Sequence, residues 1–383
     1  MRRETLSRVN KMSQWTYHNP VKIQFGAGCF DSLHSIIAGR RYCVVTYQEP
    51  YFSSLINKLE KRAGKPVMVI RDVAPNPDFV LLGEQASRFS ALSSSPEVFV
   101  ALGGGSVIDT AKVLASCGDD FERVRTYLVA NSGADTLSQK PIIAVPTTSG
   151  TGSEVTSWGT VWDSASQKKY SLARAALYPT HALVDPALML GKPRDLTIST
   201  GLDALSHALE SLWNVSANPV SAACAVSAAT EILAVLPKLA DELASLDLRT
   251  RMARAALMSG MAFSNTKTAI AHSISYPITL RHNVPHGIAC SFTLPIVLAS
   301  VADDAGLCGA SLRQIFGEDL SAAPQRLAVF LESLGVSSKP LDHGVSPSEW
   351  ESLVDAAFDG ERGMNFIGTP EKFHAAADAL GIA

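Results

Sequence analysis

The sequence is poor in charged residues and has no surplus of basic ones. Only 18% of its 383 residues are charged, and 33 basic residues stand against 36 acidic ones, which gives a net charge of −3. No polybasic segment occurs along the chain. This balance argues against nucleic acid or an anionic membrane surface as a partner. A hydrophobic content of 46% instead predicts well-buried cores.

Paired cysteines and long apolar runs are also lacking. The absence of any CxxC pair argues against a disulfide framework and a thiolate zinc site, and it predicts a reducing, cytoplasmic compartment. The six cysteines are Cys29, Cys43, Cys117, Cys224, Cys290 and Cys308. The most apolar stretch, residues 288–302, is shorter than the roughly 20 residues that span a bilayer. Arg2 and Arg3 are followed by polar residues, not by the apolar run of an export signal.

The pattern of apolar residues changes halfway along the chain. Short β-branched runs such as RYCVVTY, KPVMVI and EVFVALGGG alternate with helical segments, which predicts a parallel sheet. From about Leu196 onward, Ala, Leu and Ser recur at helical spacing. We therefore expect a polar extension over residues 1–18, an α/β domain over residues 19–192 and an all-α domain over residues 193–383.

Two segments rich in glycine and hydroxyl groups each follow a predicted strand. Residues 103–105, all glycine, separate VFVAL from a helix beginning near Ser106, so backbone amides at the helix N-terminus could hold a phosphate. The segment lacks the GxGxxG pattern, and a purely structural turn is an equal alternative. In PTTSGTGSEVTS, Thr147, Thr148 and Thr151 could donate to a phosphate, ribose or carboxamide. The alternative is a flexible surface loop.

Four residues of the second half have the spacing of a metal site. Asp203 and His207 are four residues apart in GLDALSHALES, which places both on one face of a helix. His272 and His286 follow, with prolines between them that should break any continuous helix. One carboxylate with three imidazoles suits iron, zinc, manganese or nickel. Taken singly, each half of this set is common by chance, and buried histidines are often only structural.

These motifs together resemble the iron-containing alcohol dehydrogenases. GGGSVIDTAK, PTTSGTGSEVT, ALVDPAL, GLDALSHALES and the two later histidines occur in the family's order over nearly the whole chain. The resemblance implies a dehydroquinate synthase-like fold with an α/β dinucleotide-binding domain and an all-α metal-binding domain. It implies Asp203, His207, His272 and His286 as ligands of Fe2+, or of Zn2+, Mn2+ or Ni2+. The cofactor contacts that it implies, for NADPH or NADH, are Asn76, Gly104, Gly105, Ser106, Thr147, Thr148, Thr151, Lys169 and Leu183.

The chain departs from the family pattern at two places. Members specific for NAD usually carry an aspartate after the first strand, where this chain has Tyr47. Because a carboxylate there would repel a 2′-phosphate, we expect NADPH to be accepted, with Arg71 as a possible helper. Many members also have a histidine four residues after the third ligand, where this chain has Tyr276. We therefore expect a proton relay through Tyr276, His282, a cofactor hydroxyl or water.

Cations near the ligands in the sequence point to an anionic substrate. Lys267, Arg281 and His282 flank the ligands, and Arg362 lies in the later segment ERGMNFIGTP. A buried cation needs an anionic partner, which a phosphonate, sulfonate or carboxylate could supply. The alternative is that these cations pair with Asp or Glu, or reach solvent. The segments HSISYP and PHGIACSFTLP resemble the branch of the family that reduces phosphonoacetaldehyde to 2-hydroxyethylphosphonate. Sulfoacetaldehyde is a close competitor as the substrate.

Three other functions remain open from the sequence. A dehydrogenase for plain alcohols or diols would share every cofactor and metal motif. A dehydroquinate-synthase-like lyase would share the architecture, but its ligands should be a glutamate and two histidines. A non-catalytic metal- or nucleotide-binding module is the third possibility. The family resemblance also implies a homodimer.

Overall fold

The computed structural model describes residues 14–166 and 168–382. The first 13 residues of the expected extension lie outside this range, and residues 14–18 form no helix or strand. The strands are β1 (Lys22–Phe25), β2 (Tyr42–Val45), β3 (Met68–Ile70), β4 (Val98–Gly103), β5 (Ile142–Pro146), β6 (Trp158–Asp163), β7 (Lys168–Ala173) and β8 (His181–Val184).

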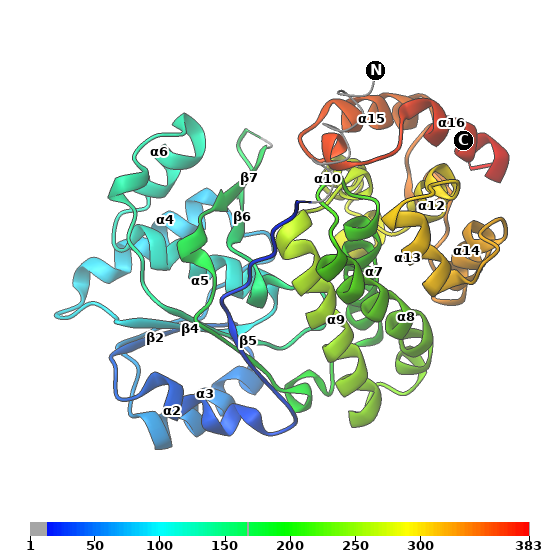
Figure 1. Cartoon of the computed structure of the whole chain (residues 1–383). Coiled ribbons are helices and arrows are strands. Elements are labelled where there is room, and N and C mark those ends of the chain that lie inside the picture. Colours follow the sequence, from blue (N-terminus) through cyan, green and yellow to red (C-terminus); the bar gives the residue numbers. More distant parts are fainter. Residues whose placement is uncertain (1–13, 167, 383) are drawn as a thin grey trace. The chain divides into compact units, whose positions relative to one another are not determined.

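The helices are distributed as the sequence predicts, between the strands in the first half and continuously in the second half (Figure 1). In the first half they are α2 (Leu33–Ile37), α3 (Pro50–Ala63), α4 (Phe79–Ser87), α5 (Gly105–Cys117) and α6 (Glu122–Ala130). In the second half they are α7 (Arg194–Leu212), α8 (Pro219–Asp241), α9 (Leu246–Thr266), α10 (Ile270–His282), α11 (His286–Ala289), α12 (Leu294–Val301), α13 (Leu307–Phe316), α14 (Ala323–Ser333), α15 (Pro347–Asp359) and α16 (Pro370–Leu380).

The first half is built on a parallel six-stranded sheet in the order β1-β8-β5-β4-β2-β3. Strands β2, β4 and β5 are buried along their whole length, which explains why their sequences are continuous apolar runs. Along β4, Phe99 and Ala101 pack into one core, whereas Val98, Val100 and Leu102 pack into another. The first core also contains residues of α4, α5 and α6, and the second contains residues of α2 and α3. Helices therefore cover both faces of the sheet (Figure 1).

A separate antiparallel pair, β6 and β7, follows the threonine-rich segment. Trp158 pairs with Ala173 and Asp163 with Lys168. An isolated bridge between Asp78 and Trp162 ties this pair to the start of α4. The sequence analysis did not predict this hairpin.

The described residues divide into two compact units. One contains residues 14–19, 205–233 and 261–382, and the other contains residues 20–166, 168–204 and 234–260. The division passes through α7, between Ala204 and Leu205, and also through α8 and α9. It therefore differs from the expected single boundary near residue 192, because segments of long helices group with the sheet. The all-helical character of the second half is confirmed.

The structure of α10 contradicts the expected helix break at Pro277. Pro277 lies inside this helix and does not end it. The turns around it place Ile274 and Ile278 fully in the interior, and the helix packs against α11 and α15. This packing outweighs the hydrogen bond that proline removes. The chain direction changes instead at Asn283, which has a left-handed backbone (φ 53°), so His286 does start a separate helix.

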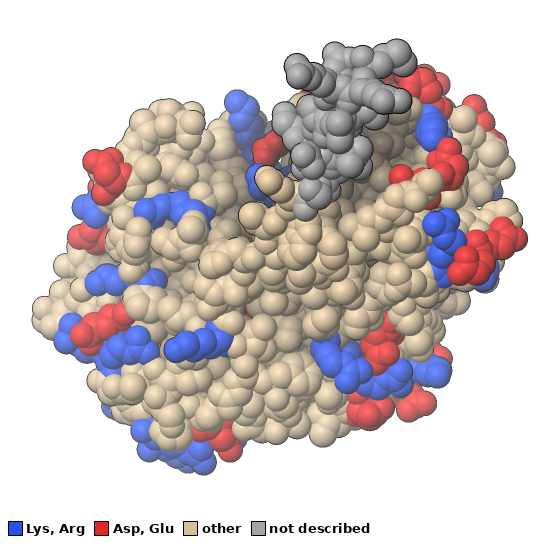
Figure 2. Space-filling model, viewed as in Figure 1, with Lys and Arg blue, Asp and Glu red and all other residues tan. Residues whose placement is uncertain are grey.

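Two surface properties bear on partners. On the face shown in Figure 2, acidic and basic residues are interspersed and form no continuous basic stripe. Among the described helices, α8 is long and apolar enough to cross a membrane, with a mean hydropathy of 1.7 and 44% of that window buried. A core helix meets the same criteria, and Ala225, Ile232 and Leu236 of α8 are fully buried.

Candidate functional site

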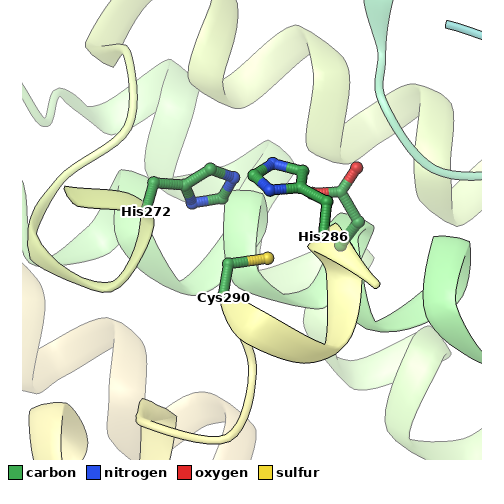
Figure 3. Close-up of side chains that lie close together, drawn as sticks. His272, His286 and Cys290 are labelled. Atoms are coloured by element: carbon green, nitrogen blue, oxygen red, sulfur yellow. The ribbon is translucent and has the colours of Figure 1, made fainter. Parts of the chain in front are cut away.

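Four potential ligands for a metal ion converge in the structure. One ligand atom each from Asp203, His272, His286 and Cys290 lies within 4.8 Å of all the others. Figure 3 shows the imidazoles of His272 and His286 and the thiol of Cys290 directed toward one another. Asp203, His272 and Cys290 are buried, and His286 is half-buried. A carboxylate, two imidazoles and a sulfur fit a divalent transition metal ion.

Three helices present these side chains. Asp203 lies in the middle of α7, His272 is the third residue of α10 and His286 is the first residue of α11. Cys290 directly follows α11, and its amide donates to the His286 carbonyl at 3.0 Å. These two side chains are therefore one helical turn apart, as Asp203 and His207 are on α7.

Glu210 fixes the orientation of His272. The Nδ1 atom of His272 donates to the Glu210 carboxylate at 2.6 Å, and the His272 amide donates to the other carboxylate oxygen at 3.1 Å. Burial alone would raise the pKa of the Glu210 carboxyl, but the charge and hydrogen bonds of His272 hold that pKa below its ordinary value. With the proton held on Nδ1, Nε2 is the nitrogen available to a metal ion.

His207 is beside this group but does not belong to it. Its ring stacks on Phe263 with a centroid distance of 4.0 Å and an interplanar angle of 5°. On its other side it stacks on His272 at 4.6 Å. The structure thus brings three of the four expected ligands into one group and places the fourth next to it.

Sequence reasoning missed Glu210 and Cys290, although both follow from spacing. Asp203, His207 and Glu210 are separated by four and three residues, which places all three on one face of α7. His286 and Cys290 have the same four-residue separation as the first pair. The absence of CxxC pairs gave no indication of Cys290, because the residue near it in the group is a histidine and not a second cysteine.

The three glycines at the junction of β4 and α5 form a turn with no room for side chains. A Cβ atom on Gly105 would lie 2.6 Å from Thr151, and one on Gly103 would lie 2.5 Å from Val107. On Gly104 it would lie 3.3 Å from the Thr148 hydroxyl. Helix α5 begins at Gly105 within this turn, so the amides of Gly105 and Ser106 precede its first helical hydrogen bond and are available to a ligand. The turn and the threonine segment, far apart in the sequence, form one cradle that fits a pyrophosphate.

Two expected cofactor residues add polar atoms to this cradle. The Thr147 side chain is fully buried, and its hydroxyl has no hydrogen-bond partner among the described residues. A hydrogen bond joins the side chains of Tyr47 and Ser106, and the Tyr47 hydroxyl lies 3.6 Å from the Cβ position of Gly104. Burial raises the pKa of Tyr47 to about 12, so this side chain is neutral. Tyr47 therefore lies at the glycine turn and lacks the negative charge that an aspartate would have there.

A buried lysine anchors the segment after the threonines. The Lys112 ammonium on α5 donates to the carbonyl oxygens of Ser153 and Trp158, at 2.8 and 2.6 Å, and to the hydroxyls of Ser153 and Thr156. Asp109, one turn earlier, accepts from the Ser153 hydroxyl at 2.6 Å and from the Thr160 amide at 2.9 Å. The helix that begins at the glycine turn thus also holds the segment that follows Thr151.

The remaining expected cofactor residues lie in the same unit. Asn76 has a left-handed backbone (φ 57°), and the carbonyl of the following proline accepts from the Trp162 amide. The Lys169 ammonium on β7 lies 5.6 Å from the centre of the Trp162 ring. The Leu183 side chain is buried in the core that also contains residues of α2 and α3, so only its backbone can face a ligand. Arg71 donates to the Ser53 hydroxyl at 2.9 Å.

The two expected proton-relay residues lie at different ends of α10. The ring of Tyr276 stacks on His286 with a centroid distance of 5.9 Å and an angle of 11°, next to the metal group. His282 is ten residues after His272, which is about 15 Å along a helix. Its Nε2 atom lies 3.1 Å from both carboxylate oxygens of Glu349. The structure therefore brings Tyr276 to the ligands but not His282.

The expected substrate cations are also separated. Arg281 is 62% exposed and its Nη1 lies 3.4 Å from Glu349 at the far end of α10. Lys267, just before α10, lies 3.4 Å from Glu361. Both therefore pair with glutamates, which is the alternative that the sequence left open. Half-buried Arg362 differs, because its Nη1 is buried and has no hydrogen-bond partner among the described residues.

Arg362 lies close to the start of α10. It precedes a short turn, Gly363–Asn365, that packs against α10 and α15. The Asn365 amide donates to the Thr268 carbonyl at 2.9 Å, which attaches this turn to the residues preceding α10. His272 is the third residue of that helix.

Comparison with known proteins identifies relatives over both halves of the chain. The profile "Iron-containing alcohol dehydrogenase" matches residues 20–186, and "Fe-containing alcohol dehydrogenase family, C-terminal" matches residues 197–376. NAD-dependent methanol dehydrogenase of Bacillus methanolicus is 34% identical over 316 residues, which is 80% of this chain and 82% of that protein. Phosphonoacetaldehyde reductase of Streptomyces viridochromogenes is 36% identical over 234 residues, 60% of this chain and 58% of that protein.

The fold also matches solved structures. Sulfoacetaldehyde reductase from Bifidobacterium kashiwanohense, crystallised in complex with NAD+, superposes with a TM-score of 0.87 at 28% identity. The match covers 97% of this chain and 99% of that chain.

Proposed function

The chain belongs to the iron-containing alcohol dehydrogenases, and within this family we propose that it reduces a small anionic aldehyde to a primary alcohol. The preferred substrate in this proposal is phosphonoacetaldehyde, with 2-hydroxyethylphosphonate as product. Arg362 is the observation that carries it, because a phosphonate oxygen would satisfy its buried, unpartnered Nη1. The similarity to a phosphonoacetaldehyde reductase and a sulfoacetaldehyde reductase, both named for anionic aldehydes, supports it.

Asp203, His207, His272 and His286 are the proposed metal ligands. The first, third and fourth belong to the convergent group, and His207 is in contact with it. When bound, the metal ion supplies Lewis-acid stabilisation of the charge that develops on the aldehyde oxygen, and the nicotinamide supplies the hydride. The ligand set accommodates Fe2+ and also Zn2+, Mn2+ or Ni2+.

Other side chains would bind the reactants and hold the proton. The glycine turn and the hydroxyls of Thr147, Thr148 and Thr151 bind the cofactor in this proposal. Tyr276, half-buried and stacked on His286, holds a proton close to the place where the alcohol forms. Arg362 binds the anionic group in this proposal, while the neighbouring Lys267 is paired with Glu361.

We propose that NADPH is accepted, and is preferred to NADH. The neutral side chain of Tyr47 at the phosphate turn offers no carboxylate to repel a 2′-phosphate. Arg71 follows β3 and could contact that group from the next strand. A much higher kcat/KM with NADH than with NADPH, measured with one aldehyde, would contradict this preference.

Steady-state kinetics of the iron-loaded protein test the substrate. Oxidation of NADPH and NADH is compared for phosphonoacetaldehyde, sulfoacetaldehyde and an uncharged aldehyde of the same length. We expect a kcat/KM at least about a hundredfold higher for the phosphonate, which is about 2.7 kcal/mol of transition-state discrimination. Equal values for all three aldehydes would leave a general alcohol dehydrogenase. A preference for the sulfonate would select the close competitor.

Arginine variants then locate the anion site. Arg362→Met should lower kcat/KM for phosphonoacetaldehyde by at least about tenfold and leave the uncharged aldehyde nearly unaffected, because only the anion loses a charge-assisted hydrogen bond. Arg313→Met removes another half-buried arginine of the same unit and serves as the control. A larger loss in Arg281→Met than in Arg362→Met would move the anion site to the far end of α10.

The proposal also covers the cellular compartment and the oligomeric state of the protein. The described cysteines form no disulfide, which is consistent with a reducing cytoplasm. A homodimer is the proposed assembly, which sedimentation velocity of the purified protein would test.

A further inference from the structure

Cys290 differs from the other deeply buried cysteines in its surroundings. Cys43 and Cys117 are packed in the hydrophobic core of the sheet unit, as is usual for a buried thiol. Cys290 is also fully buried, but its sulfur lies in a group whose other members are a carboxylate and two imidazoles. Core packing therefore explains the first two cysteines and does not explain Cys290.

The backbone of Cys290 is fixed from two directions. Its amide donates to the His286 carbonyl, which continues the turn of α11. Its carbonyl accepts from the Ser206 hydroxyl at 3.1 Å, and Ser206 lies on α7 between Asp203 and His207. The sulfur is thus held in place by the same two helices that present the carboxylate and His286.

The four ligand atoms are close enough together to converge on one ion. A nitrogen and a sulfur bound to the same zinc ion at about 2.1 and 2.3 Å, with a tetrahedral angle between them, lie about 3.6 Å apart. Every pair of ligand atoms in the group lies within 4.8 Å. Side-chain movements of up to about 1 Å would therefore bring all four atoms to bonding distance.

We propose that Cys290 is a sulfur ligand of the metal ion, in one coordination sphere with Asp203, His272 and His286. The sulfur binds as thiolate, so the S–H proton passes to solvent as the metal–sulfur bond forms. His207, the other ligand of the proposed function, has its ring stacked on Phe263 and His272 and is then the fifth ligand of this sphere. A soft ligand in the sphere favours zinc or cobalt over harder ions such as manganese.

This inference rests on the metal site of the proposed function. The experiment therefore measures metal binding and sulfur ligation separately. The full-length protein is stripped of metal, loaded with one equivalent of Co2+ and examined by absorption spectroscopy and metal analysis. We expect a thiolate-to-cobalt charge-transfer band in the near ultraviolet. The band should persist in Cys224→Ser, which removes a half-buried thiol on α8. It should disappear in Cys290→Ser, whose affinity for Zn2+ should fall by at least about tenfold.

X-ray absorption of the zinc-loaded natural protein gives a readout that needs no variant. A sulfur scatterer at about 2.3 Å from the zinc is expected. Stoichiometric metal without this scatterer and without the charge-transfer band would overturn the inference and leave the proposed function intact. Failure to bind either metal would overturn both.

Discussion

His272 illustrates how a single residue is prepared for metal binding. Glu210 holds its Nδ1 proton, and His207 stacks against its ring, so both the tautomer and the orientation are determined before any ion arrives. Carboxylate partners of this kind raise ligand basicity and keep the imidazole in place. The fully buried Glu210 contributes no ligand atom to the group, and so its effect on the metal is indirect.

We predict that Glu210→Gln weakens metal affinity by about 10- to 100-fold. The amide can still accept from His272, but it lacks the negative charge that strengthens the hydrogen bond. Competition titration of the stripped protein with a chelating dye measures the dissociation constant. Glu242→Gln, at an exposed glutamate following α8, is the control. Equal affinity in the two variants would contradict the positioning role.

A second prediction concerns the buried carboxyl of Glu154, next to Lys112 beneath the cofactor cradle. Burial raises the pKa of Glu154 from 4.5 to about 7, and burial lowers the pKa of Lys112 from 10.5 to about 8. Between about pH 4.5 and 7 the folded protein therefore holds a proton on Glu154 that the unfolded chain has lost. The contribution of this group to stability is full below pH 4.5 and is lost as the pH rises to about 7.

Glu154→Gln removes this dependence, so its Tm should rise relative to the natural protein between pH 5 and pH 7. In a protein of this size a change of 1 kcal/mol moves Tm by roughly 2 to 4 °C, which differential scanning calorimetry resolves. Exposed Glu84→Gln should follow the natural protein throughout. A Tm difference for Glu154→Gln that stays constant from pH 5 to pH 7 would contradict the assignment.

At the scale of elements, the junction of β4 and α5 forms the proposed cofactor cradle. Its three glycines are needed because Val107, Thr148 and Thr151 occupy the space where side chains would lie. Helix α5 then anchors the Ser153–Val155 turn and its neighbours through Asp109 and Lys112. The phosphate turn and the threonine segment are thus supported by one helix.

We predict that Gly105→Ala weakens NADPH binding by at least about tenfold. Its Cβ would lie 2.6 Å from Thr151, a β-branched side chain that cannot easily change its χ1 angle. Fluorescence titration of the nicotinamide measures the dissociation constant. Gly83→Ala is a matched control, because its Cβ would make an ordinary contact of 3.8 Å with Phe121. Unchanged NADPH affinity in Gly105→Ala would exclude the turn from the cofactor site.

Helices and strands could be predicted where the pattern of apolar residues in the sequence matches the burial of those residues in the structure. The buried strands β2, β4 and β5 are continuous apolar runs and were identified from sequence. Pro277 was misread as a helix break, because a local rule cannot include the contacts that hold α10 together. The β6–β7 hairpin was not predicted, because Gly159 and Thr160 interrupt the apolar residues of β6 and the partly exposed β7 begins with two lysines.

At the scale of the whole molecule, the family and both halves of the fold followed from motifs in the sequence, and the comparisons confirm them. The detailed site did not follow as completely. Asp203, His272 and His286 converge as expected, whereas the spacing of Lys267, Arg281 and His282 could not reveal that glutamates from distant segments pair with them. Long-range partners of this kind depend on tertiary contacts that a linear motif does not contain.

The most direct test of the account is the metal dependence of hydride transfer from NADPH to phosphonoacetaldehyde. The protein is stripped with a chelator and titrated with Fe2+ while absorbance of the reduced nicotinamide is followed. We expect no turnover in the stripped protein, and full activity at one ion per chain in the natural protein but not in His272→Ala. Full turnover by the metal-free protein, or equal activity of the two proteins, would contradict it.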